Sequence, residues 1–266
     1  MPELPEVETV VRGLQVTIIG ETLVDIEVPW EKALAPDSAY DSLVGKTIQN
    51  VTRRAKFIIM ELDQGALITH LRMTGKLTPV YPDKHVTVIL HFDSGKALYF
   101  QDMRKFGRMV YSDDPAEFLQ HLGPEPLAKA FTPMVFHDML QAKSRLIKPL
   151  LMDQTFIAGL GNIYVDEALF QAGIHPLSTA SSIPKKRAFS LHTAIRSILQ
   201  DSIDAQGTTV VNFSHGDNQS GSYQVALQVY GRSAEPCLIC DRPIKKIKVG
   251  QRGTHFCSNC QNLYTS

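Results

Sequence analysis

The sequence predicts an α+β protein: an N-terminal β-sandwich with a flanking helix, followed by a helical region. Three observations support this class. Short β-rich runs separated by turn residues fill the chain from about residue 22 to residue 112. Helical patterns occupy much of residues 133–206, and all four cysteines lie near the C-terminus.

The first segment predicts an amphipathic helix. Its apolar residues recur on one face with a helical period: Leu4, Val7, Val11, Leu14 and Ile18. Pro5 suits the first turn, and Glu6 suits the positive end of the helix dipole. Such a helix holds Pro2 and Glu3 at a defined place just ahead of its first turn.

The strands are expected where β-rich runs are bounded by turn signals. Two of these signals are Asp63-Gln64-Gly65 and Asp93-Ser94-Gly95, which are typical of hairpins or tight turns. The expected strands include residues 57–62, 66–71, 86–92 and 97–101.

Beyond residue 122 the pattern becomes helical. Gly123-Pro124-Glu125-Pro126 has the composition of a linker. The expected helices are residues 133–142, 148–152, 163–172 and 184–206. A polar stretch, residues 212–222, indicates a loop. We therefore predict three domains: residues 1–125, residues 126–222, and a cysteine-bearing module of residues 223–266.

Composition excludes some classes of protein. The 266 residues are 44% hydrophobic and 20% charged, which is typical of a globular protein with a buried core. No apolar run reaches the roughly 18 residues of a membrane span, and the acidic opening lacks the features of a secretory signal. We expect the chain to act in the cytosol.

The balance of charge is neutral, from 27 basic and 27 acidic residues, which counts against a strongly basic nucleic-acid binder. The basic residues nevertheless cluster along both halves of the chain. A solvated surface explains any single cluster, but their recurrence favours a shared basic surface. The clusters are Arg53, Arg54 and Lys56; Arg104, Lys105 and Arg108; Lys143, Arg145 and Lys148; Lys185, Lys186 and Arg187; and residues 242–252.

The cysteines have the spacing of a Cys₄ zinc ribbon. Cys237 and Cys240 form one pair, Cys257 and Cys260 the other, and 16 residues separate the pairs. Four thiolates close the coordination sphere, so the zinc ion would be structural. The alternative is two disulfides, which the absence of a secretion signal disfavours. Ribbons of this kind bind DNA, RNA or protein, and the basic residues between the pairs favour nucleic acid.

Pro2 could act as a nucleophile through its amine. Removal of Met1 would leave a secondary amine with a pKa of about 8, so part of it is neutral near pH 7. Such an amine can attack a sugar C1′ and form an iminium, with Glu3 moving the proton. The alternative is that Pro2 only leads into the helix.

Several separated motifs together carry a resemblance to a known family. They are residues 1–9 (MPELPEVET), 53–56 (RRAK), 70–75 (HLRMTG), 102–107 (DMRKFG), 159–167 (GLGNIYVDE), 229–232 (VYGR) and the terminal zinc ribbon. In this order they resemble formamidopyrimidine-DNA glycosylase, the bacterial enzyme that removes 8-oxoguanine and ring-opened purines. The resemblance covers nearly the whole chain and implies a helix–two-turn–helix in the helical domain.

The resemblance implies three catalytic residues, Pro2, Glu3 and Lys56, and one supporting residue, Glu6. Pro2 would be the Schiff-base nucleophile and Glu3 the general acid and base. Glu6 would support both, and Lys56 would hold a phosphate beside the lesion.

The resemblance also implies how the protein would contact duplex DNA. Met73, Arg104 and Phe106 would form a wedge that fills the stack left by an extruded base, with Arg104 paired to the orphaned cytosine. The alternative for Met73 and Phe106 is burial in the core, although the adjacent glycines favour exposed turns. Backbone contacts are implied for His70, Lys148, Asn162, Tyr230 and Arg252, and His70 has the alternative of simple packing. Residues 212–223 would close over the flipped base.

Leu4, Arg104 and Phe106 favour the purine-specific branch over endonuclease VIII, its sister enzyme for oxidised pyrimidines. The expected activity is therefore a bifunctional DNA glycosylase and AP lyase of base excision repair, with one structural Zn²⁺, acting as a monomer on duplex DNA in the bacterial cytosol or nucleoid. Three alternatives stay open: the sister activity, a DNA-binding module without catalysis, and a zinc-ribbon protein for RNA or a protein partner.

Overall fold

A computed structural model describes residues 1–35, 40–208 and 221–265. The chain divides into two compact units, one of residues 1–121 with 205–224 and one of residues 122–204 with 225–266. The predicted division into domains of residues 1–125, 126–222 and 223–266, which sets the zinc ribbon apart from the helices, stays a prediction. Among the described residues, no helix combines the length and the apolar character that crossing a membrane requires.

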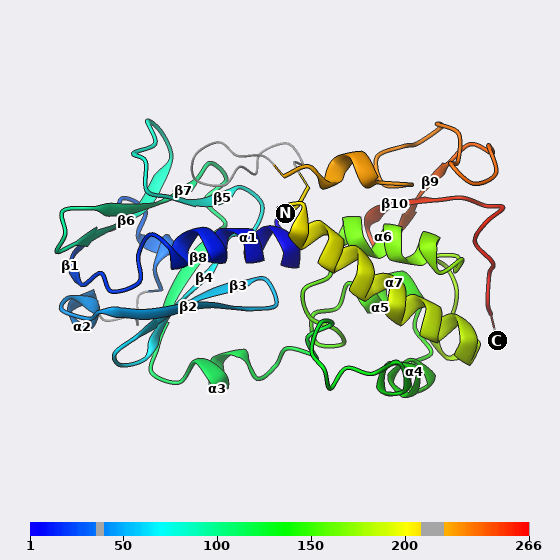
Figure 1. Ribbon diagram of the computed structural model, residues 1–266, viewed down its shortest axis with the longest axis horizontal. Coiled ribbons are helices and arrows are strands. Elements are labelled where there is room, and N and C mark those ends of the chain that lie inside the picture. Colours follow the sequence, from blue (N-terminus) through cyan, green and yellow to red (C-terminus); the bar gives the residue numbers. More distant parts are fainter. Residues whose placement is uncertain (36–39, 209–220, 266) are drawn as a thin grey trace. The chain divides into compact units, whose positions relative to one another are not determined.

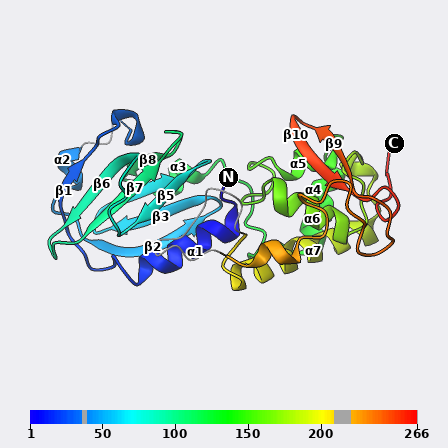
Figure 2. The same ribbon diagram turned by 90° about the horizontal axis from the view of Figure 1, so that it is seen from above.

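The first unit contains two four-stranded antiparallel sheets, visible in Figures 1 and 2. The strand orders are β1-β6-β7-β5 and β2-β3-β4-β8. The strands are β1 (Leu23–Glu27), β2 (Ile48–Arg54), β3 (Phe57–Leu62), β4 (Ala66–His70), β5 (Gly75–Thr78), β6 (Val86–Phe92), β7 (Ala97–Asp102) and β8 (Arg108–Ser112). The helices are α1 (Leu4–Gln15), α2 (Tyr40–Leu43), α3 (Pro115–Leu119) and the 3₁₀ turn η1 (Glu31–Ala33).

One core holds this unit together. Met60 of β3 and Phe100 of β7 are both fully buried in it, so the two sheets share their apolar faces. Helix α1 lies along β2 (Figure 2) and packs against it with the apolar face that its sequence predicts. Val7 and Val11 are 1% and 3% exposed. The predicted β-sandwich with a flanking helix is confirmed.

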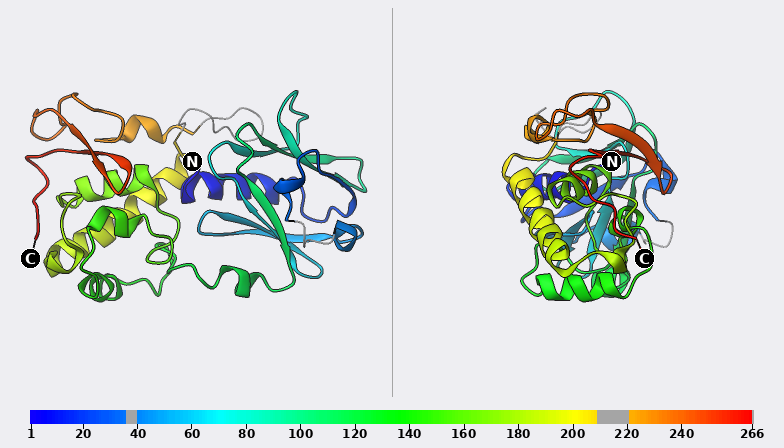
Figure 3. Two further views of the ribbon diagram at one scale, coloured as in Figure 1. Left: turned by 180° about the vertical axis from the view of Figure 1, so that it is seen from behind. Right: turned by 90° about the vertical axis from the view of Figure 1, so that its right-hand side faces the viewer.

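The second unit is helical and carries a two-stranded ribbon. Figure 3 shows the long helix α7 in yellow and the ribbon in orange to red. Its elements are α4 (Pro133–Gln141), α5 (Ile147–Leu151), α6 (Asn162–Gln171), η2 (Ala180–Ser182), α7 (Lys185–Asp204), β9 (Lys245–Val249) and β10 (Arg252–Phe256); a further turn, η3 (Tyr223–Ala226), spans the boundary between the units.

Helix α6 is the centre of this unit, because nearly all of its side chains are buried. It packs against α7, where the Tyr164 and Ser202 hydroxyls are 2.6 Å apart and fully buried. A helix that is buried on all sides gives no amphipathic pattern, and the predicted range of 163–172 nevertheless differs from α6 by only one residue at each end.

Candidate active site, DNA-contact residues and zinc centre

The head of α1 holds Pro2 and Glu3 in a buried setting. Pro2 is buried, and Glu3, the N-cap residue, is 2% exposed. The backbone N–H of Glu3 donates a hydrogen bond of 2.9 Å to Oε2 of Glu6. This contact satisfies a donor that the helix itself leaves unpaired, and it fixes the chain direction just after Pro2.

The second oxygen of Glu6 reaches a distant segment of the same unit. Oε1 accepts hydrogen bonds from the backbone N–H of Thr208 at 2.9 Å and from its hydroxyl at 3.0 Å. A Cβ on Gly207 would lie 3.0 Å from that oxygen, and the φ of Gly207 is 85°, so glycine suits this position. Glu6 therefore joins the start of α1 to the segment before residues 209–220, and most of the predicted base-closing loop lies outside the described residues.

Lys56 and His70 lie at neighbouring strand ends. Lys56 is 4% exposed and follows Ala55, whose φ of 54° forms the turn between β2 and β3. His70 ends β4, opposite Phe57, with the two ring centroids 4.7 Å apart. Burial, followed by the charges of Arg72 and Lys56, lowers the pKa of His70 from its ordinary value to about 3.

The hydrogen bond of His70 agrees with that low pKa. The backbone N–H of Arg72 donates to Nδ1 of His70 at 3.0 Å, so this nitrogen is an acceptor. A neutral ring with its proton on Nε2 is the tautomer that follows. His70 can therefore donate one hydrogen bond through Nε2, and it can do so without carrying a charge.

The three predicted wedge residues lie on two loops of the sandwich. Met73 follows β4 and is 37% exposed, and Phe106 follows β7 and is 50% exposed. The Arg104 guanidinium carbon lies 4.8 Å from the centre of the Phe106 ring. The alternative that Met73 and Phe106 belong to the core is wrong, because both side chains meet solvent.

In the second unit, Asn162 and Lys148 both contact the ribbon. Asn162 is the first residue of α6, and its Nδ2 donates to the Gly253 carbonyl at 3.0 Å. The Lys148 ammonium lies 2.6 Å from Oδ1 of Asp166 and 3.3 Å from the same Gly253 carbonyl. Because the Lys148 side chain is fully buried, its phosphate contact stays a prediction that would require this pair to open.

Tyr230 and Arg252 flank the same region. Glu167 of α6 accepts the backbone N–H groups of residues 228, 229 and 230, and burial raises its pKa above the ordinary value against the effect of these bonds. The Tyr230 ring lies edge-to-face with His255 at 5.1 Å. Arg252 is exposed and begins β10, one residue past the left-handed turn of Gly250 and Gln251.

The four cysteines converge as their spacing predicts. Their Sγ atoms all lie within 4.8 Å of one another, with 3.9 Å between Cys237 and Cys260 and 3.5 Å between Cys240 and Cys257. Bonds of about 2.3 Å from a tetrahedral zinc ion put sulfur atoms roughly 3.8 Å apart, so the four thiolates fit the ion. Phe170, Val229 and Ile244 pack with the buried Cys237 and Cys257, whereas Cys240 and Cys260 are partly exposed.

Comparison with known families decides the identity. A model of the formamidopyrimidine-DNA glycosylase N-terminal domain matches residues 1–109. The H2TH domain of the same enzymes matches residues 122–214, and the zinc finger found in FPG and IleRS matches residues 234–263. The chain belongs to the formamidopyrimidine-DNA glycosylase family. It is therefore a DNA glycosylase of base excision repair, and it carries one structural zinc ion.

Individual relatives agree over the full length. The formamidopyrimidine-DNA glycosylases of Bacillus licheniformis and Bacillus subtilis are 43% and 42% identical, over 98% of this chain and 99% of each relative. The solved structure of the Thermus thermophilus enzyme has a TM-score of 0.92 at 37% identity, covering 98% of this chain and 99% of its own. A Lactococcus lactis variant in complex with Fapy-dG-containing DNA has a TM-score of 0.92 at 39% identity, covering 98% and 100%.

Sequence reasoning did not assign several residues that organise this glycosylase. Asp102 accepts hydrogen bonds from two loops, Asp166 pairs with Lys148, and Thr208 binds Glu6. Asp102 and Asp166 stand inside the motifs that carry the resemblance, which was the available signal. Thr208 had none, because its partner is 202 positions away.

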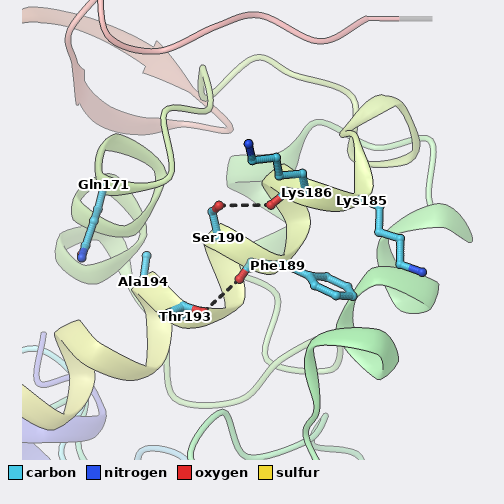
Figure 4. Close-up of a pocket in the computed structure, with 7 residues that line it drawn as sticks. All are labelled: Gln171, Lys185, Lys186, Phe189, Ser190, Thr193 and Ala194. Carbon is cyan, nitrogen blue, oxygen red and sulfur yellow. Dashed lines mark hydrogen bonds between the residues drawn. The ribbon is translucent and has the colours of Figure 1, made fainter.

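A pocket of about 720 Å³ on the second unit lies apart from these residues (Figure 4). Helix α7 contributes most of its wall, and Gln171 at the end of α6 closes one side, as Figure 4 shows. None of the predicted site residues lines this pocket. The lining residues are Gln171, Lys185, Lys186, Phe189, Ser190, Thr193 and Ala194.

Proposed function

We propose that this glycosylase excises oxidised purines, 8-oxoguanine and formamidopyrimidines, from duplex DNA and then cleaves the abasic site by β,δ-elimination. The observation that carries the proposal is the buried, hydrogen-bonded head of α1, where Pro2 and Glu3 precede a helix start held by Glu6. A nucleophile needs a fixed position relative to its acid and base, and this arrangement supplies a fixed backbone.

The chemistry begins after Met1 is removed. The neutral Pro2 amine donates its lone pair to C1′, and the bond from C1′ to the base breaks with its electrons leaving on the base, which takes up a proton. Opening of the sugar ring leaves an iminium between Pro2 and C1′, and this cation accepts electrons during β-elimination. Glu3 carries the protons, and Lys56 neutralises a phosphate next to the sugar.

When the damaged base leaves the DNA helix, protein side chains must fill the space that it leaves in the base stack. Met73 and Phe106 are exposed apolar side chains, and Arg104 is a planar donor that can pair with cytosine. The solved Lactococcus lactis complex with Fapy-dG-containing DNA supports a damaged purine in DNA as the substrate. His70, Lys148, Asn162, Tyr230 and Arg252 are the proposed backbone contacts, and the protein acts as a monomer in the bacterial cytosol.

Borohydride trapping tests the proposal. Met1-free protein is mixed with a duplex carrying 8-oxoguanine opposite cytosine, and the reductant converts the iminium into a stable protein–DNA bond. We expect a covalent band that disappears in Pro2→Gly. Pro5→Ala is the matched control, because it removes a nearby buried proline of α1 without touching the amine. A Pro2→Gly variant that still traps and excises normally would overturn the assignment of the nucleophile.

Trapping, base release and binding measurements together separate the three alternative functions. Faster release of thymine glycol than of 8-oxoguanine would favour the sister activity on oxidised pyrimidines. Tight binding to the lesion duplex without any covalent band would favour a DNA-binding module that lacks catalysis. Binding to RNA in preference to the lesion duplex would favour the zinc-ribbon alternative.

A further inference from the structure

Asp102 is a buried carboxylate at the end of β7, and it holds the loop that follows. The Asp102 side chain is 1% exposed. Its Oδ2 accepts the backbone N–H of Gly107 at 2.6 Å, and its Oδ1 accepts the backbone N–H of Arg104 at 3.2 Å. The loop of residues 103–107 carries Arg104 and Phe106. Two of its backbone N–H groups therefore bind the same carboxylate.

Thr74 connects this loop to the neighbouring one. Gly75 of β5 pairs directly with Asp102 of β7, so the loops that adjoin these strand ends start side by side. The Thr74 hydroxyl donates to Oδ1 of Asp102 and accepts the backbone N–H of Arg104 at 3.1 Å. Thr74 is 8% exposed, and its bond to Asp102 is buried. Met73 directly precedes Thr74, so the Thr74 hydroxyl links the backbone of the Met73 loop to the backbone of Arg104.

Both loops contain a residue in an unfavourable backbone conformation, which surrounding contacts must stabilise. Arg72 and Lys105, one in each loop, have φ values of 55° and 57° in the left-handed region, which is unfavourable for residues other than glycine. A Cβ on Gly107 would lie 2.4 Å from the Phe100 ring, so this loop also has no room to shift inward. Strained loops keep such conformations only when surrounding contacts over-determine them.

We propose that Asp102 and Thr74 are positioning residues that join the Met73 loop and the Arg104–Phe106 loop into one rigid wedge. The inference rests on the proposed function, because it assigns these exposed side chains to DNA insertion. Two independent loops would each lose conformational freedom when they enter the stack, and a joined pair loses less. All three side chains then enter together, and base extrusion is faster.

Thr74→Val tests the junction with little change in volume. It removes the hydroxyl that both donates and accepts, whereas Thr74→Ser keeps it. Thr78→Val is the matched control, because Thr78 is a buried threonine at the far end of β5, the strand that follows Thr74, and its hydroxyl hydrogen-bonds to the backbone of Val80. We expect kcat/KM on 8-oxoguanine duplex to fall on the order of tenfold in Thr74→Val. Thr74→Ser and Thr78→Val should stay close to the parent protein.

A fluorescence measurement reports insertion without the chemistry. All variants are made in a Pro2→Gly background and mixed with a duplex carrying 2-aminopurine next to the lesion, whose fluorescence rises when its neighbour is unstacked. We expect slower insertion in Thr74→Val, restored by serine. In a Met73→Ala background, the effect of Thr74→Val on insertion should be smaller, because the Met73 loop then has no side chain to insert and only the Arg104–Phe106 loop is left for Thr74 to position.

The outcomes distinguish this inference from the proposed function. Absence of a trapped band in the otherwise unchanged Met1-free protein would reject the proposed function. Normal trapping, with a folded Thr74→Val variant that inserts and excises at the parent rate, would reject the rigid wedge alone. Equal slowing by Thr74→Val and Thr78→Val would also reject it, since it would indicate loss of sheet stability. If Thr74→Val does not fold, Asp102→Asn replaces it, because the amide keeps the shape but places a donor where an acceptor is needed.

Discussion

Lys148 and Asp166 form an ion pair that solvent does not reach. Nζ of Lys148 lies 2.6 Å from Oδ1 of Asp166, and both side chains are 0% exposed. The other oxygen of Asp166 accepts the backbone N–H of His255 at 2.8 Å. One carboxylate therefore joins α5, α6 and β10. Water cannot screen this pair, so each charge depends on the other.

Breaking the pair should destabilise the second unit strongly. Lys148→Met leaves the Asp166 carboxylate buried without its cation, and the expected loss in free energy of unfolding is about 3–5 kcal/mol. Urea titration followed by hydrogen exchange in residues 245–256 would measure it. Lys148→Met together with Asp166→Leu should recover part of the loss, but not all, because the His255 N–H then lacks its acceptor.

Arg145→Met is the matched control for that prediction. Arg145 and Asp153 form an ion pair of similar length, 2.7 Å, but their side chains are 52% and 27% exposed. A surface pair contributes about 0–1 kcal/mol, so this variant should unfold nearly as the parent does. Equal losses in Lys148→Met and Arg145→Met would contradict the importance assigned to burial.

His70 should make stability depend on pH. Its pKa in the folded protein is about 3, below its ordinary value, so the unfolded chain binds the proton more readily. The stabilising contribution is complete above about pH 6.5 and is lost progressively as the pH falls toward 3. In His70→Asn, whose Oδ1 can accept the Arg72 N–H, the decline in unfolding free energy between pH 6.5 and 4 should be shallower. An NMR titration placing the His70 midpoint near 6.5 would contradict this prediction.

Gly107 and Gly13 should respond in opposite directions to alanine. At Gly107 the added methyl group would lie 2.4 Å from the Phe100 ring, and we expect a loss of about 1–3 kcal/mol from overpacking. At Gly13, inside α1, nothing lies within 4 Å, so alanine should stabilise by roughly 0.5–1 kcal/mol through helix propensity. Thermal melting of both variants tests the pair, and a neutral Gly107→Ala would show that the loop can move away from the ring.

Cys237→Ser should release the zinc ion and loosen the ribbon. Cys237 is 1% exposed and packs in the small core with Phe170 and Val229, so its loss opens both the metal site and that core. We expect less than one zinc ion per chain by atomic emission, faster hydrogen exchange in residues 234–263, and weaker DNA binding. Ser258→Ala, at an exposed position between Cys257 and Cys260, is the control and should retain the metal. Full DNA affinity in the zinc-free variant would contradict a structural role for the ion.

Local pattern predicted much of the fold. The expected strands at residues 57–62 and 86–92 coincide with β3 and β6, because turn residues bound each run and β-rich composition is a local property of the chain. The helix predicted at 184–206 is α7, Lys185–Asp204, where fraying of the ends accounts for the small difference. The cysteine spacing predicted the zinc centre for the same reason, since each pair is local in the chain.

The sequence by itself determined the fold class, the face of α1, the ligands of the zinc ion and, through its motifs, the family. Only the tertiary structure decided that Glu6 binds Thr208, that Asp102 joins two loops, and that Lys148 is enclosed with Asp166. The physical reason is the range of the interaction. Periodicity and turn chemistry act between residues a few positions apart, whereas a buried carboxylate takes its partners from whichever segments the packed core brings beside it.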